Sequence, residues 1–284
     1  MASGTIDLSY FPGCSMATSA KESNASLMQV CRRLGINLIE LEDWNCCGSS
    51  SAHSIEPGLA FRLAARNLSL ATPERPLMIM CPGCLHRMKA VHKQLKEDPE
   101  LRLRAEKACG RSINPDVQII HFFEVLEGID FSRAKNIQLT PLDRVKFVPY
   151  YGCMLAHPPA FRKEKNYHGL IEKNLTALGA EALQWGFSAK CCGTFLAAAR
   201  PDIATPLVNK IIAGAVRAGA ECIVTACAMC QLNLEIRCTL KEKIPTLHLS
   251  EMLALALGEK GYDGWFKRHL VDPRPLLKKK GLIS

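Results

Sequence analysis

The sequence predicts an α/β protein made of two duplicated Rossmann-like units, each with a parallel four-stranded sheet, related by pseudo-two-fold symmetry. Three observations support this prediction. One set of cysteine motifs occurs twice in the same order, short apolar segments end at those motifs, and helical patterns of about 10 to 20 residues separate the apolar segments. Strands that alternate with helices in this way are typical of parallel sheets with helical crossovers.

The cysteine motifs show an internal duplication. The first half reads YFPGC at 10–14, CCG at 46–48 and CPGC at 81–84, and the second half reads YYGC at 150–153, CCG at 191–193 and CAMC at 227–230. The spacing is similar in the two halves: 31 and 37 residues separate the lone cysteine from the pair, and 33 and 34 residues separate the pair from the CxxC. Ten cysteines in this order indicate a repeated fold.

The apolar pattern between the motifs repeats as well. In the first half we expect strands at 5–10, 36–42, 77–80 and 117–120, helices at 17–34 and 57–71, a long helix after CPGC and a short helix after His121. In the second half we expect strands at 145–150, 181–185, 222–226 and 245–249, with helices at 163–178, 201–218, 230–241 and 251–258. The resulting domains are 1–140 and 141–258, and residues 259–284 form a tail that looks like a docking or wrapping segment.

All ten repeated cysteines follow predicted strands, at the edge where parallel sheets form their binding sites. A structural zinc ion and a cubane [4Fe-4S] cluster each take four such ligands, whereas each half offers five. The glycines at 48 and 193 allow the tight turn that adjacent cysteines need to reach one centre. Five thiolates favour a larger or non-standard cluster, and zinc or a conventional cluster in one half is the alternative.

Four cysteines lie outside the repeated pattern. Cys31, Cys109, Cys222 and Cys238 have no counterpart in the other half, and we expect them to act as small buried hydrophobic residues. A further repeated pattern, HFFEVL at 121–126 and HLSEML at 248–253, places a histidine before a helix and a glutamate in its first turn. We interpret these residues as structural because a carboxylate there is favoured by the helix dipole.

Composition narrows the function classes. The 284 residues are 48% hydrophobic and carry a net charge of +9, but only 6% are aromatic and most basic residues are dispersed, so nucleic-acid binding is not indicated. An acidic protein partner, an anionic substrate or a solvated surface would each account for the charge. No export signal and no apolar run of roughly 18 residues is present. We therefore expect a cytoplasmic protein without a transmembrane segment, in a compartment where cysteine clusters usually bind metal.

The double five-cysteine pattern, with WNCCGSSSAHS at 44–54 and CQLNLE at 230–235, resembles the CCG-domain family and most closely its heterodisulfide reductase members, the B subunits, including those of the related complexes of sulfur-oxidising bacteria. The resemblance implies one non-cubane [4Fe-4S] cluster in each half. It also implies ferredoxin-like and flavoprotein subunits as partners in the same complex, and a small thiol, disulfide or sulfur-carrier substrate. The implied ligands are Cys14, Cys46, Cys47, Cys81 and Cys84 for one cluster, and Cys153, Cys191, Cys192, Cys227 and Cys230 for the other.

The resemblance suggests a mechanism for reducing a disulfide or for the reverse oxidation of two thiols. Cleaving a disulfide takes two electrons, whereas iron-sulfur clusters transfer them singly. Our hypothesis is that the substrate enters between the domains and receives one electron from each side. His157 and His53, which follow cysteine motifs, are candidate proton donors, although a lone histidine near a cluster more often packs against it or supports its ligands.

Two other functions remain open on sequence grounds. The chain could transfer electrons within a system that oxidises a hydroxy acid, glycerol 3-phosphate or succinate, in which no disulfide is cleaved. It could also be a zinc-stabilised scaffold without a redox role. The identity of the partner subunits and the bound metal would distinguish these functions.

Overall fold

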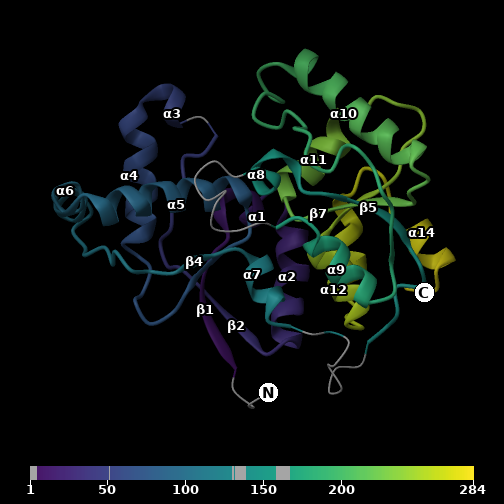
Figure 1. Cartoon of the computed structure of the whole chain (residues 1–284), viewed down its shortest axis with the longest axis horizontal. Helices are drawn as coiled ribbons and strands as arrows, with labels where there is room; N and C mark the ends of the chain where they lie inside the picture. The colour runs from purple at the N-terminus through teal and green to yellow at the C-terminus, as the bar shows by residue number, and fades with distance from the viewer. Residues whose placement is uncertain (1–4, 51, 130, 132–138, 158–166) are drawn as a thin grey trace.

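The computed structural model describes the chain except residues 1–4, 51, 130, 132–138 and 158–166. It confirms the predicted α/β fold with two four-stranded parallel sheets (Figure 1). The two sheets have equivalent strand orders, β2-β1-β3-β4 and β6-β5-β7-β8. The strands are β1 (Ile6–Phe11), β2 (Ile36–Glu40), β3 (Leu77–Ile79), β4 (Ile119–Ile120), β5 (Lys146–Tyr150), β6 (Glu181–Ala182), β7 (Cys222–Thr225) and β8 (Thr246–His248).

The helices of the first half follow the predicted order, with short additional helices at Gly13–Ala17 and Ala52–Ile55. The helix expected at 17–34 begins at Lys21 and ends at Arg33, and Thr18, whose hydroxyl donates to the Cys14 carbonyl, is the C-cap of the short helix before it. The expected long helix after CPGC is broken at Asp98, since the following proline disfavours helical geometry there and the Asp98 carboxylate caps the next helix. The helices are α1 (Gly13–Ala17), α2 (Lys21–Arg33), α3 (Ala52–Ile55), α4 (Pro57–Leu68), α5 (Pro82–Glu97), α6 (Pro99–Cys109) and α7 (Phe122–Glu127).

The second half repeats this arrangement. Of the helix expected at 163–178, residues 163–166 lie outside the described part of the chain, residues 167–169 are not helical, and the helix runs from Leu170 to Ala177. The helix expected at 230–241 starts two residues earlier and ends at Arg237. The helices are α8 (Gly152–Ala156), α9 (Leu170–Ala177), α10 (Pro201–Arg217), α11 (Ala228–Arg237) and α12 (Leu249–Ala256).

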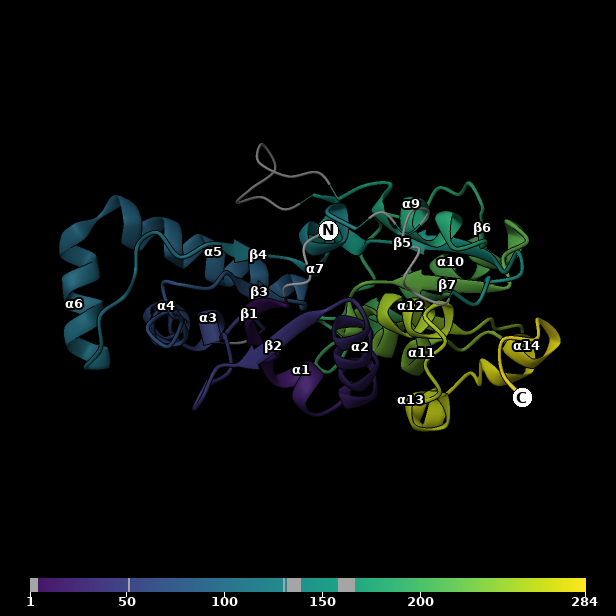
Figure 2. The same cartoon turned by 90° about the horizontal axis from the view of Figure 1, so that it is seen from below.

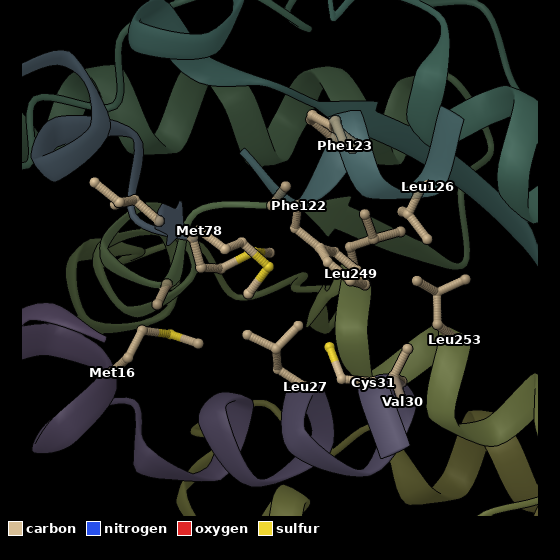
Figure 3. Close-up of a cluster of buried hydrophobic side chains, with 14 of the residues drawn as sticks. Met16, Leu27, Val30, Cys31, Met78, Phe122, Phe123, Leu126, Leu249 and Leu253 are labelled. Carbon is tan, nitrogen blue, oxygen red and sulfur yellow. The ribbon is translucent and has the colours of Figure 1, made fainter. Parts of the chain in front are cut away.

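The two halves share one apolar core. Side chains of α1 and α2 face those of α7 and α12, including Leu27, Phe122 and Leu253 (Figure 3). Both cartoon views place α2 beside α12, and the hydroxyls of Ser26 and Ser250 are 2.7 Å apart there (Figures 1 and 2). Burial of this interface orients the sheets relative to each other. The division near residue 140 stays a prediction.

Contacts between the halves occur in matched pairs. Helix α1 contacts α11 as α5 contacts α8, and α2 contacts α12 as α7 contacts α9. His121 and His248 begin equivalent helices, and each forms a capping box with the glutamate three residues later. The structural role that we predicted for these histidines and glutamates is therefore confirmed.

The C-terminal tail packs against the body of the protein. It contains α13 (Tyr262–Trp265), the 3-10 helix η2 (Phe266–Arg268) and α14 (Arg274–Lys279). Trp265, Phe266 and Leu277 are buried in the shared core, and the tail contacts α2 and α12. The final segment thus wraps over the junction of the two halves.

His269 anchors this tail through a buried charge network. Its Nδ1 lies 3.0 Å from a carboxylate oxygen of Glu235 on α11, and its Nε2 lies 3.1 Å from one of Glu251 on α12. Burial alone would lower the pKa of His269, but the two carboxylates outweigh burial and raise it to about 10. The imidazole is therefore a cation at neutral pH. The neighbouring His248 has its pKa lowered to about 3 by burial and by nearby histidines, so it is neutral.

We predict that, because of this network, the stability of the protein falls as the pH becomes alkaline. Because the pKa of His269 rises from 6.5 to about 10 on folding, its contribution is full below pH 6.5 and is lost as pH rises towards 10. The loss should be on the order of a few kcal/mol. Denaturant unfolding at pH 6 and pH 10 would measure it, with His269→Gln as the control for other groups that titrate there. An equal pH-dependent loss in the two proteins would contradict the assignment.

Candidate functional site

The N-terminal cysteines converge at the carboxyl edge of the first sheet. Cys14 lies in α1 directly after β1, and Cys46 and Cys47 lie in the loop that follows β2. Cys81 is the N-cap of α5 after β3, and Cys84 lies in the first turn of that helix. Because β2, β1 and β3 are adjacent in the sheet, their loops meet at one place.

The five sulfur atoms of this half form one connected set of contacts. The Sγ atoms of Cys47 and Cys84 are 3.0 Å apart. Further thiol hydrogen bonds join Cys14 to Cys46, Cys46 to Cys47, and Cys81 to Cys84. No disulfide forms among them, since all five are free thiols. The structure therefore brings together all five predicted residues of the N-terminal set.

The C-terminal cysteines repeat this arrangement at the second sheet. The Sγ atoms of Cys192 and Cys230 are 3.7 Å apart, and hydrogen bonds join Cys153 to Cys191 and Cys227 to Cys230. The sulfur of Cys227 also accepts a hydrogen bond from the backbone N–H of Cys230 at the start of α11. The second predicted set of five is thus also assembled in one place.

Two glycines let the backbone pass close to the sulfur atoms. Gly13 and Gly152 directly precede the lone cysteines and have φ angles of 69° and 64°, which other residues adopt only with strain. A Cβ atom at Gly13 would lie 3.0 Å from the Cys84 sulfur, and one at Gly152 would lie 3.3 Å from the Cys230 sulfur. A side chain at either position would therefore press on the thiol set.

Hydrogen bonding adjusts the protonation of the thiols. The bond from Cys14 holds the pKa of Cys46 well below its usual range, and the equivalent bond from Cys153 lowers that of Cys191 to about 6. The backbone N–H groups of Gly48 and Gly193 donate to the same two sulfurs and act in the same direction. The same bonds between thiols raise the pKa of the donating thiols, Cys14 and Cys153, so in each half the accepting cysteine loses its proton more readily and gives the thiolate form that binds metal.

This donor set fits the thiolate ligands of a metal or iron-sulfur site. Five thiols in contact, two of them at a helix start where free N–H groups stabilise thiolate, match the ligands that clusters use. Within the described residues, no group of three or more His, Cys, Asp or Glu side chains is placed to hold one metal ion.

The two cysteine sites are neighbours. The helices that carry Cys14 and Cys230 contact each other, as do those that carry Cys84 and Cys153. Phe195, from the loop after the second CCG, also reaches the first site, since its ring tip would lie 3.7 Å from a Cβ atom at Gly83 of CPGC. The two sets of cysteines are therefore held close to each other by contacts between the halves.

The structure describes the side chain of one of the two candidate proton donors. His157 lies at the C-terminal end of α8 and is exposed, and its backbone N–H donates to the carbonyl of Cys153 at 3.0 Å. Its ring centre lies 6.4 Å from that of His168. His53 lies in α3, but its side chain is outside the described part of the structure. The assignment of both residues as proton donors stays a prediction.

The four remaining cysteines are separate from both sets. Cys31, Cys222 and Cys238 are buried, as predicted, and burial raises the pKa of Cys31 to about 12. Cys109 differs because it is partly exposed, at the end of α6 in a groove beside α4.

Sequence reasoning missed residues that support the sites. The side-chain amide of Asn233 donates to the carbonyl of Cys192 at 2.8 Å and fixes the second CCG turn. Phe195 is 50% exposed although it is apolar, which places a hydrophobic contact beside the cysteines. Gly13 and Gly152 could have been found, because a glycine precedes the lone cysteine in both halves. Asn233 and Phe195 have no counterpart of the same type in the first half, so the repeat does not single them out.

We predict that Gly13→Ala damages the N-terminal site more than backbone strain explains. The substitution should cost about 1 kcal/mol in strain and more from the contact with Cys84. Gly35→Ala is the matched control, since Gly35 has a similar φ of 71° and nothing within 4 Å of its Cβ position. Thermal melting and iron content of the anaerobic protein are the measurements. Equal effects of the two substitutions would show that the sulfur contact is unimportant.

The sequence is similar to those of subunits of two oxidoreductases. The chain is 29% identical to the 8-methylmenaquinol:fumarate reductase membrane anchor subunit of Wolinella succinogenes, over 95% of this chain and 99% of that protein. It is 27% identical to the B subunit of the ferredoxin:CoB-CoM heterodisulfide reductase of Methanosarcina mazei, over 88% and 89% of the two chains. Among the described residues of the chain, no helix is long and apolar enough to cross a membrane.

Similarity to a solved structure supports the fold alone. A crystal structure of a hypothetical protein from Helicobacter pylori superposes with a TM-score of 0.72 at 14% identity, covering 94% of this chain. The present chain spans about half (52%) of that structure. The family model of the CCG cysteine-rich domain matches residues 8–89 and 147–235, which include all ten repeated cysteines. The chain therefore belongs to the CCG cysteine-rich domain family.

Proposed function

We propose that the chain is the iron-sulfur subunit of an oxidoreductase complex that reduces a disulfide or, in reverse, oxidises two thiols. One observation carries the proposal: two complete sets of five thiols are each gathered at one place, and helices that carry members of the two sets contact each other. Disulfide cleavage is a two-electron reaction, and two neighbouring one-electron centres meet that need. The similarity to the B subunit of a heterodisulfide reductase supports the same function.

Each half would hold one non-cubane [4Fe-4S] cluster, in the proposed units 1–140 and 141–258. The ten ligands would be the two cysteine sets described above. When bound, each cluster would supply or accept one electron. The chain's own residues would orient the substrate: the exposed cysteines at 14, 46 and 191 mark the open side of the sites, and Phe195 offers an apolar contact there. His157 is the proposed proton donor, since it is exposed and adjacent to α8, which carries Cys153.

The partners follow from the same proposal. Ferredoxin-like and flavoprotein subunits would deliver electrons singly to this chain, and the complex would work in the cytoplasm. Both named relatives are subunits of larger complexes, which supports an assembly of this kind.

A second candidate function is electron transfer between a dehydrogenase partner and a quinone, without disulfide cleavage. The relative from Wolinella succinogenes favours it, because its name describes part of a methylmenaquinol:fumarate reductase. The two functions differ in whether sulfur from a substrate contacts the cysteine sites.

We predict that a disulfide changes the electron paramagnetic resonance spectrum of the full chain. The disulfide of 2-mercaptoethanol is added to the anaerobically reduced protein, and the free thiol to the oxidised protein. A new signal is expected, because substrate sulfur would contact iron in either case. The control is a water-soluble menaquinone analogue. Oxidation by the quinone with no spectral response to thiol or disulfide would replace the first function with the second.

We also predict that each set of five cysteines acts as a unit. Cys84→Ser should remove on the order of half of the bound iron, since it breaks only the N-terminal set, and Cys230→Ser should remove the other half. Cys109→Ser is the matched control, because Cys109 is a partly exposed thiol outside both sets. Iron analysis with a melting curve for each variant is the measurement. Full iron retention in Cys84→Ser would contradict the ligand assignment.

A further inference from the structure

The two halves carry opposite charges at one largely buried position of the duplication. Aligning Cys84 with Cys230 pairs Lys89, five residues after the first cysteine, with Glu235, five residues after the second. Aligning the two capping boxes, His121 with His248, pairs Glu124 on α7 with Glu251 on α12. A lysine in the first half is therefore replaced by a glutamate in the second, whereas its carboxylate partner is kept.

In the first half the two positions form an ion pair. The Nζ atom of Lys89 lies 3.8 Å from Oε1 of Glu124, and the side chains are 16% and 12% exposed. The hydroxyl of Tyr167 also donates to Glu124 at 2.8 Å. The pair ties α5, which begins at the CPGC motif, to α7 behind it.

In the second half the equivalent positions would place two carboxylates together. Glu235 and Glu251 have side chains that are 5% and 0% exposed, and a buried pair of like charges is strongly unfavourable without a cation. His269 from the tail lies between them and contacts both. The backbone N–H of Leu270 adds a hydrogen bond of 2.7 Å to Glu235.

The same tail segment reaches both cysteine sites. The His269 ring lies 3.1 Å from the side-chain amide of Gln231, the residue after Cys230. The Arg268 guanidinium donates to the carbonyl of Thr18, whose hydroxyl bonds to the carbonyl of Cys14. The cavity beside these residues measures about 30 Å³, which is room for one water molecule. The segment is thus a structural connection and leaves no space for a small-molecule ligand.

We infer that His269 is a positioning residue of the C-terminal cysteine site, where it supplies from the tail the cation that Lys89 supplies within the first half. It joins α11 to α12 as Lys89 joins α5 to α7, and so fixes the helix that carries Cys230. The inference rests on the proposed function only where iron content is measured. The exchange of lysine for histidine as the cation can be tested by melting temperature without any metal.

The test is a double-mutant cycle in the full chain with Glu235→Lys and His269→Ala. His269→Ala alone leaves two buried carboxylates, and Glu235→Lys alone places a second cation beside the imidazole, so each should lower the melting temperature by about 10 °C. Together they recreate the lysine–glutamate pair of the first half, and the double variant should melt above either single variant. Arg274→Ala is the control in the same tail, since Arg274 forms its ion pair with Asp272, and both side chains are exposed by 40% or more.

Hydrogen exchange and iron content distinguish a role of His269 in positioning α11 from a general effect on the stability of the protein. His269→Ala should speed amide exchange in residues 228–237 while α5 stays protected, and it should release iron from the C-terminal site only, about half of the total. The double variant should restore protection and iron. If His269→Ala does not fold, recovery of folding in the double variant supports the inference.

A double variant no better than the worse single variant, or unchanged exchange in α11 after His269→Ala, would overturn the inference. Absence of iron from the wild-type chain would instead reject the proposed function, and the melting and exchange results would still decide the role of His269.

Discussion

The close approach of backbone to sulfur at Gly13 and Gly152 is the constraint on which both sites depend. Each glycine has a left-handed φ and leaves no room for a side chain beside a CxxC thiol. Because the lone cysteine follows immediately, its sulfur turns towards the same place that the other loops reach. Three adjacent strands then bring five thiols together, and the hydrogen bonds among them lower the pKa of one thiol in each half, Cys46 and Cys191.

The duplication supplies the five thiols twice and also places the two sets next to each other. The halves meet through equivalent helices and share one core, so the two cysteine sites are held as neighbours by the most buried part of the protein (Figure 3). The second half nevertheless depends on a segment that the first half lacks. Its tail provides the cation at Glu235 and Glu251 and contacts α2 across the junction. The tail therefore stabilises one half and the contact between the halves at once.

Much of the fold could be predicted because the same motifs and apolar segments occur in both halves, so each half supports the prediction for the other. The strands that end at Cys14, Cys46 and Cys81 were evident from apolar segments, and the sheet order then places their loops together. Local features that act through side chains were harder to predict. The short helix α1 was not predicted, whereas the break at Asp98 had a visible signal in the following proline.

The tail network could not be predicted from the pattern. His269 lies beyond the repeat, and its two carboxylate partners are separated from it by 34 and 18 positions, so only the folded chain brings them together. Phe195 is similar, since its contact with the first site spans the two halves. The spacing of apolar residues predicts the helices and strands within one half, whereas these residues make contacts between the halves.

The central claim is that each half gathers five thiolates around a multi-iron centre. Iron and acid-labile sulfide in the anaerobically purified full chain test it most directly. Two four-iron clusters predict about eight iron and about eight sulfide per chain. About two zinc ions per chain without sulfide would contradict the account.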